Sequence, residues 1–384
     1  MPSKIDLSNP ELGFISFILS DAVIDMLLCL YEEKAFEVGS RNTADTVSED
    51  LNLVLERLNE DWLIERTGNS YRLSYSGSII TVKILEMLNS IQAHIPDQER
   101  DILIIPGHKN PDLEYSSIRR FYCQNNQLIS QILQLPILAS MHFPCEHPSY
   151  VTLQDIGLIE YSNHDYSLTI DGQVIIAEIQ KMAVTIRTIE KFVDFFETHS
   201  WESVPEFAVD RIDDLIGAEL VCDIPLNFNQ GFLFYHDILN EAEHIHGVSS
   251  WARANIADTL RERVLEGKEV ELIITPELAL ELLKDPYVEQ AKELRHFSNL
   301  KFRVSKVPVK VGLTVTDKCL SFGLFTRDGV TYDSIYDLVC RSDEALDWGE
   351  RLFEYYRANS IPMRDFFLKS CISSVARKIF LQTG

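Results

Sequence analysis

An internal repeat, offset by 95 residues, constrains this chain more than any other feature of its sequence. The stretch from Trp62 to Ile80 aligns without a gap on the stretch from Gly157 to Ile175. Identical pairs include Leu63/Leu158, Ile64/Ile159, Glu65/Glu160, Tyr71/Tyr166, Leu73/Leu168, Gly77/Gly172, Ile80/Ile175 and Met87/Met182. Two copies of one pattern predict two copies of one supersecondary unit.

Each copy has the pattern of a hairpin followed by a helix. Apolar and polar residues alternate on both sides of a turn, at Gly68-Asn69 in the first copy and Ser162-Asn163 in the second. The predicted strands are Leu63–Arg66, Tyr71–Ser74, Leu158–Tyr161 and Tyr166–Thr169, and the predicted closing helices are Ser78–His94 and Gln173–Glu197. The last part of a winged-helix unit has this order: a helix, a short hairpin and a closing helix. The alternative is a duplicated hairpin without that fold.

The helices upstream of each hairpin fit the same interpretation. Phe14–Tyr31 is an apolar helix, and Thr46–Glu60, with Ser48 as its cap, is the candidate recognition helix. In the second copy, Tyr115–Leu135 and Pro148–Ile156 take the corresponding places. The sequence therefore predicts two tandem winged-helix units.

The second half of the chain alternates strands and helices, which predicts an α/β domain. Expected elements are strands at Ile245–Trp251, Val270–Ile274, Leu300–Ser305, Val311–Thr316 and Ser321–Phe325, and helices at Ala252–Leu265, Pro276–Leu283 and Ser342–Tyr356. The predicted fold class is α+β, with winged helices at 1–100 and 101–200, the second possibly degenerate. An α/β effector domain at 201–360 and a C-terminal helix at 361–384 follow.

The net charge of the chain is unfavourable for DNA binding. The sequence has 35 Lys and Arg but 59 Asp and Glu, which gives a net charge of −24. Affinity for DNA comes largely from cations placed on phosphates. The candidate DNA contacts are Asn52, Arg57, Arg66, Arg72, Arg119 and Arg120. The alternative is a protein-interaction or sensor protein whose winged helices no longer bind DNA.

Several motifs of the second half resemble one family of archaeal regulators. They are GVSSW at 247–251, EGKEVELIIT at 266–275, LTVTDKCLSFGLFTRDGVTYD at 313–333 and SDEALDWGERLFEYY at 342–356. A linker-like stretch, VPEFAVDRIDDLIGAELV, spans 204–221. The family is that of the Fil-type winged-helix regulators of methanogens. The resemblance implies a transcription regulator whose C-terminal domain senses a signal or dimerises.

Other side chains suggest binding rather than catalysis. His244, His246, Trp251 and Tyr332 are the candidate ligand-binding residues for a small-molecule effector. The strand–helix–strand pattern from Ile245 is similar to a phospholipase-D-like half-domain, but the chain lacks the His-x-Lys-x4-Asp string that such enzymes require. We therefore predict no enzyme and no cofactor.

A cluster of His142, Cys145 and His147 offers a metal or redox sensor as a weaker alternative, but it lacks a visible fourth ligand. No metal site is predicted from it. The scattered cysteines and the lack of a signal peptide or a long apolar stretch indicate a cytoplasmic protein outside the membrane. A homodimer is expected, because winged-helix regulators usually read paired half-sites.

Overall fold

The computed structural model describes residues 17–37, 49–94, 115–143, 147–222, 230–294 and 296–369. Its contacts divide the chain into two compact units, Met1–Val193 and Asp194–Gly384. Both predicted repeats lie in the first unit. Within the described ranges, no helix has the length and apolar character needed to cross a bilayer.

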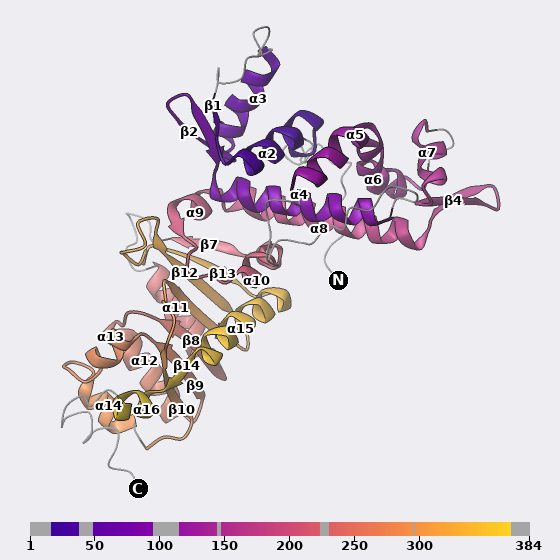
Figure 1. Cartoon of the computed structure of the whole chain (residues 1–384). Helices are drawn as coiled ribbons and strands as arrows, with labels where there is room; N and C mark the ends of the chain where they lie inside the picture. Colours follow the sequence, from indigo (N-terminus) through magenta and orange to yellow (C-terminus); the bar gives the residue numbers. More distant parts are fainter. Residues whose placement is uncertain are drawn as a thin grey trace. The chain divides into compact units, whose positions relative to one another are not determined.

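The N-terminal unit contains the repeat as two helix–hairpin–helix copies (Figure 1). The elements of the first copy are α2 Asp21–Glu33, β1 Phe36–Glu37, α3 Glu49–Glu60, β2 Ile64–Thr67, β3 Ser70–Leu73 and α4 Tyr75–His94. Those of the second copy are α5 Tyr115–Leu133, α6 Leu135–Ser140, α7 Ser149–Asp155, β4 Ile159–Ser162, β5 Asp165–Leu168 and α8 Ile170–Lys191. The hairpins match residue for residue at the predicted offset, although β1 extends the sheet of the first copy alone.

Equivalent hydrogen bonds hold each hairpin to its closing helix. The hydroxyl of Ser74 accepts from the amide of Gly77 at 2.9 Å, and that of Thr169 accepts from the amide of Gly172 at 3.1 Å. A Cβ on Gly77 would lie 1.9 Å from the carbonyl oxygen of Leu63. A Cβ on Gly172 would lie 2.1 Å from the matching oxygen of Leu158. The repeated glycine therefore permits the helix to begin directly against the first strand.

The two copies are joined through their closing helices. α4 packs against α8, and Figure 1 shows the helices side by side with the two hairpins at opposite ends of the pair. Ile84 and Ile179, which are equivalent in the repeat, are both fully buried. So are Met87 and Met182, at 1% and 2% exposure. The core of the N-terminal unit thus lies between equivalent faces of the two copies.

Three predicted helices are wrong in their extent. The helix predicted at Phe14–Tyr31 is interrupted at Ser20, whose backbone is extended with ψ 145°, and α2 begins at Asp21. The helix predicted from Tyr115 ends at Leu133, because Pro136 at the start of α6 has no amide hydrogen to continue it. The helix predicted from 173 to 197 ends at Lys191, since Phe192 leaves helical geometry with φ −121°. The chain passes from one unit to the other at this break.

The C-terminal unit is built on a nine-stranded mixed sheet. Its strands are β6 His199–Ser200, β7 Glu219–Cys222, β8 His244–Ser249, β9 Glu269–Ile274, β10 Leu300–Ser305, β11 Val311–Thr316, β12 Leu320–Thr326, β13 Tyr336–Cys340 and β14 Ser360–Pro362. The order is β14-β10-β9-β8-β11-β12-β13-β7, with β6 beside β12. β8, β9 and β10 are parallel to one another, and the other pairs are antiparallel.

Helices cover both faces of this sheet. They are α9 Val193–Thr198, α10 Glu206–Val209, the 3-10 turn η3 Ile212–Leu215, α11 Gln230–Asn240, α12 Ala254–Leu265, α13 Pro276–Glu281, α14 Val288–Leu294, α15 Asp343–Ala358 and α16 Met363–Lys369. Ile245 of β8 packs in one cluster with Val264 of α12. The next residue, His246, stacks on Phe353 of α15. Successive side chains of a strand point to opposite faces, so α12 and α15 lie on opposite sides of the sheet.

The predicted strand–helix–strand of this unit is confirmed as β8, α12 and β9. Two predicted caps are also confirmed: the hydroxyl of Thr275 accepts from the amide of Leu278, and that of Ser342 accepts from the amide of Ala345. The predicted cap Ser48 and the residues beyond 369 of the predicted C-terminal helix lie outside the described residues.

Gly172→Ala tests the contact that positions the closing helix. On helix propensity alone, alanine would stabilise α8 by about 1 kcal/mol. Because the added Cβ meets the oxygen of Leu158, we expect instead a loss of about 1–3 kcal/mol in the free energy of unfolding. Urea unfolding followed by circular dichroism measures the change. Gln173→Ala, at the exposed neighbouring position, is the control, and a Gly172→Ala variant at least as stable as the wild type would contradict the expectation.

Candidate functional sites

Two of the predicted DNA-contacting arginines are paired with carboxylates of the same unit. Nε of Arg57, on α3, lies 3.5 Å from Oδ2 of Asp61, and its guanidinium lies over the ring of Phe17. Arg72, on β3, forms an ion pair of 2.6 Å with Glu65 of β2. Both arginines remain more than half exposed, at 53% and 61% of their side-chain surface. They are accessible, but part of their charge is already neutralised.

Arg66 differs from these two arginines. Its Nε donates to the carbonyl of Gly68 at 3.0 Å, and the guanidinium lies 5.6 Å from the centre of the Tyr71 ring. No carboxylate of the described residues pairs with it. Of the three predicted arginines whose side chains the structure describes, Arg66 is therefore the one whose charge no carboxylate neutralises.

The remaining predicted contacts are placed only by their backbone. Asn52 lies on α3, and Arg119 and Arg120 lie in the first turns of α5, whereas their side chains fall outside the described part of the structure. Whether any of the six residues contacts DNA stays a prediction.

The second hairpin and the two helices directly before it, α6 and α7, offer no comparable cations. The sequence has no Lys or Arg at positions 121–180, a stretch of 60 residues that includes α6, α7 and the whole second hairpin. The hairpin instead carries Glu160 and Asp165, both exposed. A duplex phosphate therefore meets a neutral or negative surface there.

A cavity of about 630 Å³ lies within the C-terminal unit. Trp251 and Tyr332, two of the predicted ligand-binding residues, both line it, with their ring centres 5.0 Å apart. Apolar side chains of α12 and β9, among them Leu260 and Leu272, form part of the wall. The prediction that these two aromatic residues share one site is consistent with this geometry, whereas ligand binding itself stays a prediction.

Two glycines make room for Tyr332. Gly312 of β11 and Gly323 of β12 are direct partners across the antiparallel pair. A Cβ on either would lie 2.3 Å from the hydroxyl oxygen of Tyr332. That hydroxyl donates to Oδ1 of Asp337 at 3.3 Å. The paired glycines therefore let the tyrosine lie flat against the sheet and present its ring to the cavity.

Two tyrosine hydroxyls of the cavity, those of Tyr235 and Tyr332, stay neutral at physiological pH. Burial raises the pKa of Tyr235 to about 12, and its hydroxyl pairs with Oγ1 of Thr314 at 2.7 Å. Burial, followed by the charge of Asp337, raises the pKa of Tyr332 well above its usual value. A neutral phenol can both donate and accept a hydrogen bond, which suits a site that orients a small molecule.

The charged side chains around the cavity are mostly cations. Those that line it are Arg253, Arg261, Lys301, Arg303, Arg364 and the single carboxylate Asp337. Arg253 lies over the ring of Trp251 at 4.9 Å. Arg261 is paired with Glu293, and the guanidinium of Arg303 donates to the hydroxyl of Ser360. In a chain with net charge −24, this cavity is a local site of positive charge.

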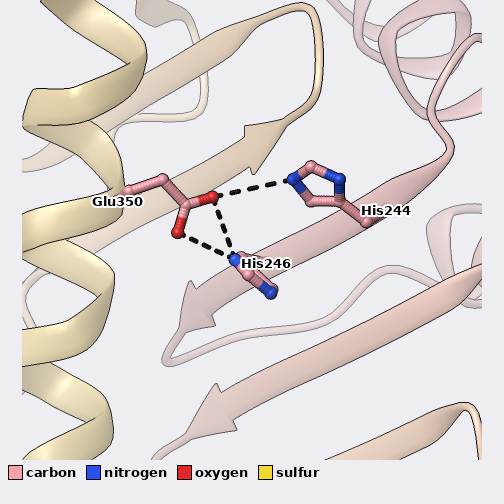
Figure 2. Close-up of side chains that lie close together, drawn as sticks. All are labelled: His244, His246 and Glu350. Atoms are coloured by element: carbon pink, nitrogen blue, oxygen red, sulfur yellow. Dashed lines mark hydrogen bonds and ion pairs between the residues drawn. The ribbon is translucent and has the colours of Figure 1, made fainter.

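The two predicted histidines do not line that cavity. His244 and His246 point from β8 toward α15 and meet Glu350 there (Figure 2). Nδ1 of His246 lies 2.9 Å and 3.0 Å from the two carboxylate oxygens, and Nε2 of His244 lies 3.7 Å from one of them. The structure thus brings Trp251 and Tyr332 together at the cavity, while alternation along β8 places the two histidines on the opposite face. Ligand binding by the histidines stays a prediction.

Sequence reasoning missed Glu350, Tyr235 and Asp337. Glu350 is 104 residues from His246, and no local pattern distinguishes it from the other acidic residues of α15. Of the other predicted cluster, His147 lies at the start of α7, where its Nδ1 accepts from the amide of Ser149, while Cys145 lies outside the described residues.

The raised pKa of Tyr235 makes stability depend on pH at the alkaline end. Above its usual value of 10 the unfolded chain loses this proton, whereas the folded chain keeps it until about 12. We expect stability to fall between these values, and to fall less steeply in Tyr235→Phe, which cannot ionise. Urea unfolding at a series of pH values measures both slopes. Equal slopes in the two proteins would show that Tyr235 titrates normally.

Comparison with known proteins shows that this chain is similar to one family of regulatory proteins. Residues 233–359 match the family model described as the middle domain of methanogenesis regulatory protein FilR1. The methanogenesis regulatory protein FilR1 of Methanothrix harundinacea (strain 6Ac) is 25% identical over 211 residues, which are 54% of this chain and 47% of that protein. The chain therefore spans about half the length of this curated relative.

Two solved structures are similar at a lower level. TrmBL2, an archaeal chromatin protein described with a novel mode of DNA binding, is 11% identical with a TM-score of 0.30 and covers 91% of this chain and 97% of its own. Nuc, a phospholipase D family member from Salmonella typhimurium, is 10% identical with a TM-score of 0.30 and covers 38% and 96%. These scores are too low to establish a shared fold. The match of residues 233–359 and the curated relative confirm the predicted resemblance of this chain to the Fil-type methanogenesis regulators.

Proposed function

We propose that this protein is a transcription regulator in the cytoplasm and not an enzyme. Its N-terminal unit is a pair of winged helices that binds double-stranded DNA, and its C-terminal unit binds a small-molecule effector. The observation that carries the proposal is the combination of two helix–hairpin–helix copies with a region that matches a domain of a regulatory protein. A unit that binds DNA beside a domain that can hold a ligand is the ordinary plan of such a regulator.

The first copy is the part that contacts DNA. α3 is its recognition helix, and the hairpin of β2 and β3 is its wing. Arg57 extends from the helix and Arg66 and Arg72 extend from the wing, all with accessible side chains. The hairpin of the second copy contributes structure rather than phosphate contacts, since neither the hairpin nor α6 and α7 before it contain Lys or Arg. The predicted contacts Arg119 and Arg120 of this copy lie on α5.

The effector occupies the cavity of the C-terminal unit. A volume of about 630 Å³ lies within the range of small-molecule sites, roughly 300–1,000 Å³. Its apolar wall favours an apolar molecular body, and the surrounding arginines favour a negative group on that body. Trp251 and Tyr332 pack on the ligand, and the hydroxyls of Tyr235 and Tyr332 orient it.

The alternative function is an interaction or sensor protein that has lost DNA contact. The acidic second hairpin and the ion pairs of Arg57 and Arg72 favour it. Homodimer formation also stays a proposal. Because α4 and α8 already pair within one chain, a homodimer would use a different surface.

Fluorescence anisotropy of labelled double-stranded fragments, titrated with protein at several salt concentrations, tests DNA binding. Each phosphate contact contributes a slope of about −0.9 to the logarithm of affinity against the logarithm of salt. The triple variant Arg57→Ala, Arg66→Ala, Arg72→Ala should therefore bind more weakly, with a slope smaller by up to about 2.7. The triple variant Lys284→Ala, Lys292→Ala, Arg351→Ala removes the same charge from exposed positions of the C-terminal unit and is the control.

Equal losses in both triple variants would mean that net charge alone matters, and would refute these contacts. A folded wild-type protein that binds no fragment at the lowest salt would favour the interaction protein instead. An affinity loss confined to the first variant supports the proposed regulator.

Removing the carboxylates that neutralise the arginines should act in the opposite direction. Glu65→Gln frees Arg72, and Asp61→Asn frees Arg57, while each also removes a negative charge close to the phosphates. We expect both variants to bind DNA more tightly than the wild type in the same anisotropy titration. Glu160→Gln, at the position equivalent to Glu65 in the second hairpin, should leave affinity nearly unchanged. A gain at Glu160 as large as that at Glu65 would place DNA on both hairpins.

A further inference from the structure

Three side chains with metal-binding atoms converge on the sheet face opposite α12. His244 and His246 are two residues apart on β8 and therefore share a face. Glu350 reaches them from α15, which packs on that face (Figure 2). Their potential ligand atoms all lie within 4.8 Å of one another. Two imidazoles and one carboxylate are a recurrent protein ligand set for zinc and related metals.

The spacing of these atoms is close to that of a metal site. A tetrahedral ion with bonds of about 2.0–2.2 Å holds its ligand atoms roughly 3.4 Å apart. Glu350 lies 2.9 Å from Nδ1 of His246 and 3.7 Å from Nε2 of His244, which bracket that value. The ligand atoms of all three residues lie within 4.8 Å of one another, so they can surround one ion.

Glu350 also lacks the partners that its neighbours on α15 have. Asp347 pairs with Arg211 and Arg351, and Glu354 pairs with Arg357. Within the described residues, Glu350 meets only the two histidines and no Lys or Arg. Its carboxylate is therefore available to a cation held between it and the two histidines.

One ring of the cluster is held in position. The imidazole of His246 stacks on the ring of Phe353, with centres 4.3 Å apart and planes within 3°. This contact fixes the plane in which Nδ1 faces Glu350. His244 is freer, with 37% of its side chain exposed, so it can adjust to an ion. A fixed ligand and an adaptable one suit a site that fills from solvent.

We propose that His244, His246 and Glu350 bind one divalent late transition-metal ion of the zinc class. Imidazole nitrogens favour such ions over magnesium or calcium, which prefer all-oxygen sites. The side chains are each about a quarter to a third exposed, so a fourth position stays open to water and the ion exchanges with solvent. The ion ties β8 to α15. Since Val248 and Ser249 of the same strand line the cavity, the metal stiffens one wall of the effector site.

Metal titration of the tag-free full-length protein tests this site directly. After treatment with a chelator and dialysis, the protein is titrated with Co²⁺, whose visible absorption reports its coordination, and with Zn²⁺ in competition with a chromophoric chelator. We expect one ion per chain. Glu350→Gln removes one ligand, and the double variant His244→Ala, His246→Ala removes two. In both, affinity should fall by more than the roughly 10–100-fold that loss of an outer-shell partner costs.

Matched controls separate this site from any other metal-binding group of the chain. Glu354→Gln removes a carboxylate one turn along the same helix, and His236→Ala removes a histidine of α11 that contacts Asn240. Both should bind Co²⁺ and Zn²⁺ as the wild type does. Absence of stoichiometric binding, or affinity unchanged in Glu350→Gln, would overturn the proposal. Circular dichroism checks that each variant is folded. Should the double variant not fold, the proposal is tested by Glu350→Gln alone, which keeps the shape of the side chain. None of these readouts depends on DNA or effector binding.

Discussion

The N-terminal unit depends on one close contact, made twice, between a glycine and a strand carbonyl. At Gly77 and Gly172 the closing helix starts so near the first strand of its hairpin that a single Cβ would collide with the carbonyl oxygen of Leu63 or Leu158. The carbonyl also accepts from the residue that caps the helix, Ser74 or Thr169. Helix direction is thereby fixed relative to the hairpin, and the buried faces of α4 and α8 are presented in the same way by both copies.

Much of this unit was predictable because its determinants are local. The repeat set the hairpin register, since turn residues and alternating side chains act over a few positions. Helix ends were less predictable. Periodicity continues past Phe192 and past Leu133, but the passage to the next unit and the missing amide hydrogen of Pro136 stop the helices earlier. The hairpin register places Arg72 opposite Glu65, which allows their ion pair. Counting the Lys and Arg residues of the sequence does not show that such a pair neutralises part of the charge.

The candidate site residues of the C-terminal unit were predictable only in part. Trp251 and Tyr332 lie together as expected, but the space that Tyr332 occupies depends on two glycines facing each other across β11 and β12. Strand alternation showed that His244 and His246 share a face. The alternation did not show which face of the sheet they occupy, nor that Glu350 of α15 lies on that face. Both depend on the packing of α15 against β8, which brings together residues 104 positions apart in the chain. Such contacts carry no local pattern.

The pairing of α4 with α8 has a consequence for how this protein can change. In a homodimer of winged helices, one substitution alters both subunits at once, so the two surfaces that face the duplex stay identical. Here the two copies occupy different positions of one chain, so a mutation in one copy does not change the sequence of the other. The first hairpin keeps Arg66 and Arg72, while the second has Tyr161 and Ser167 at the same positions. Because each copy has its own sequence, the surface of one hairpin can change while the surface of the other is kept.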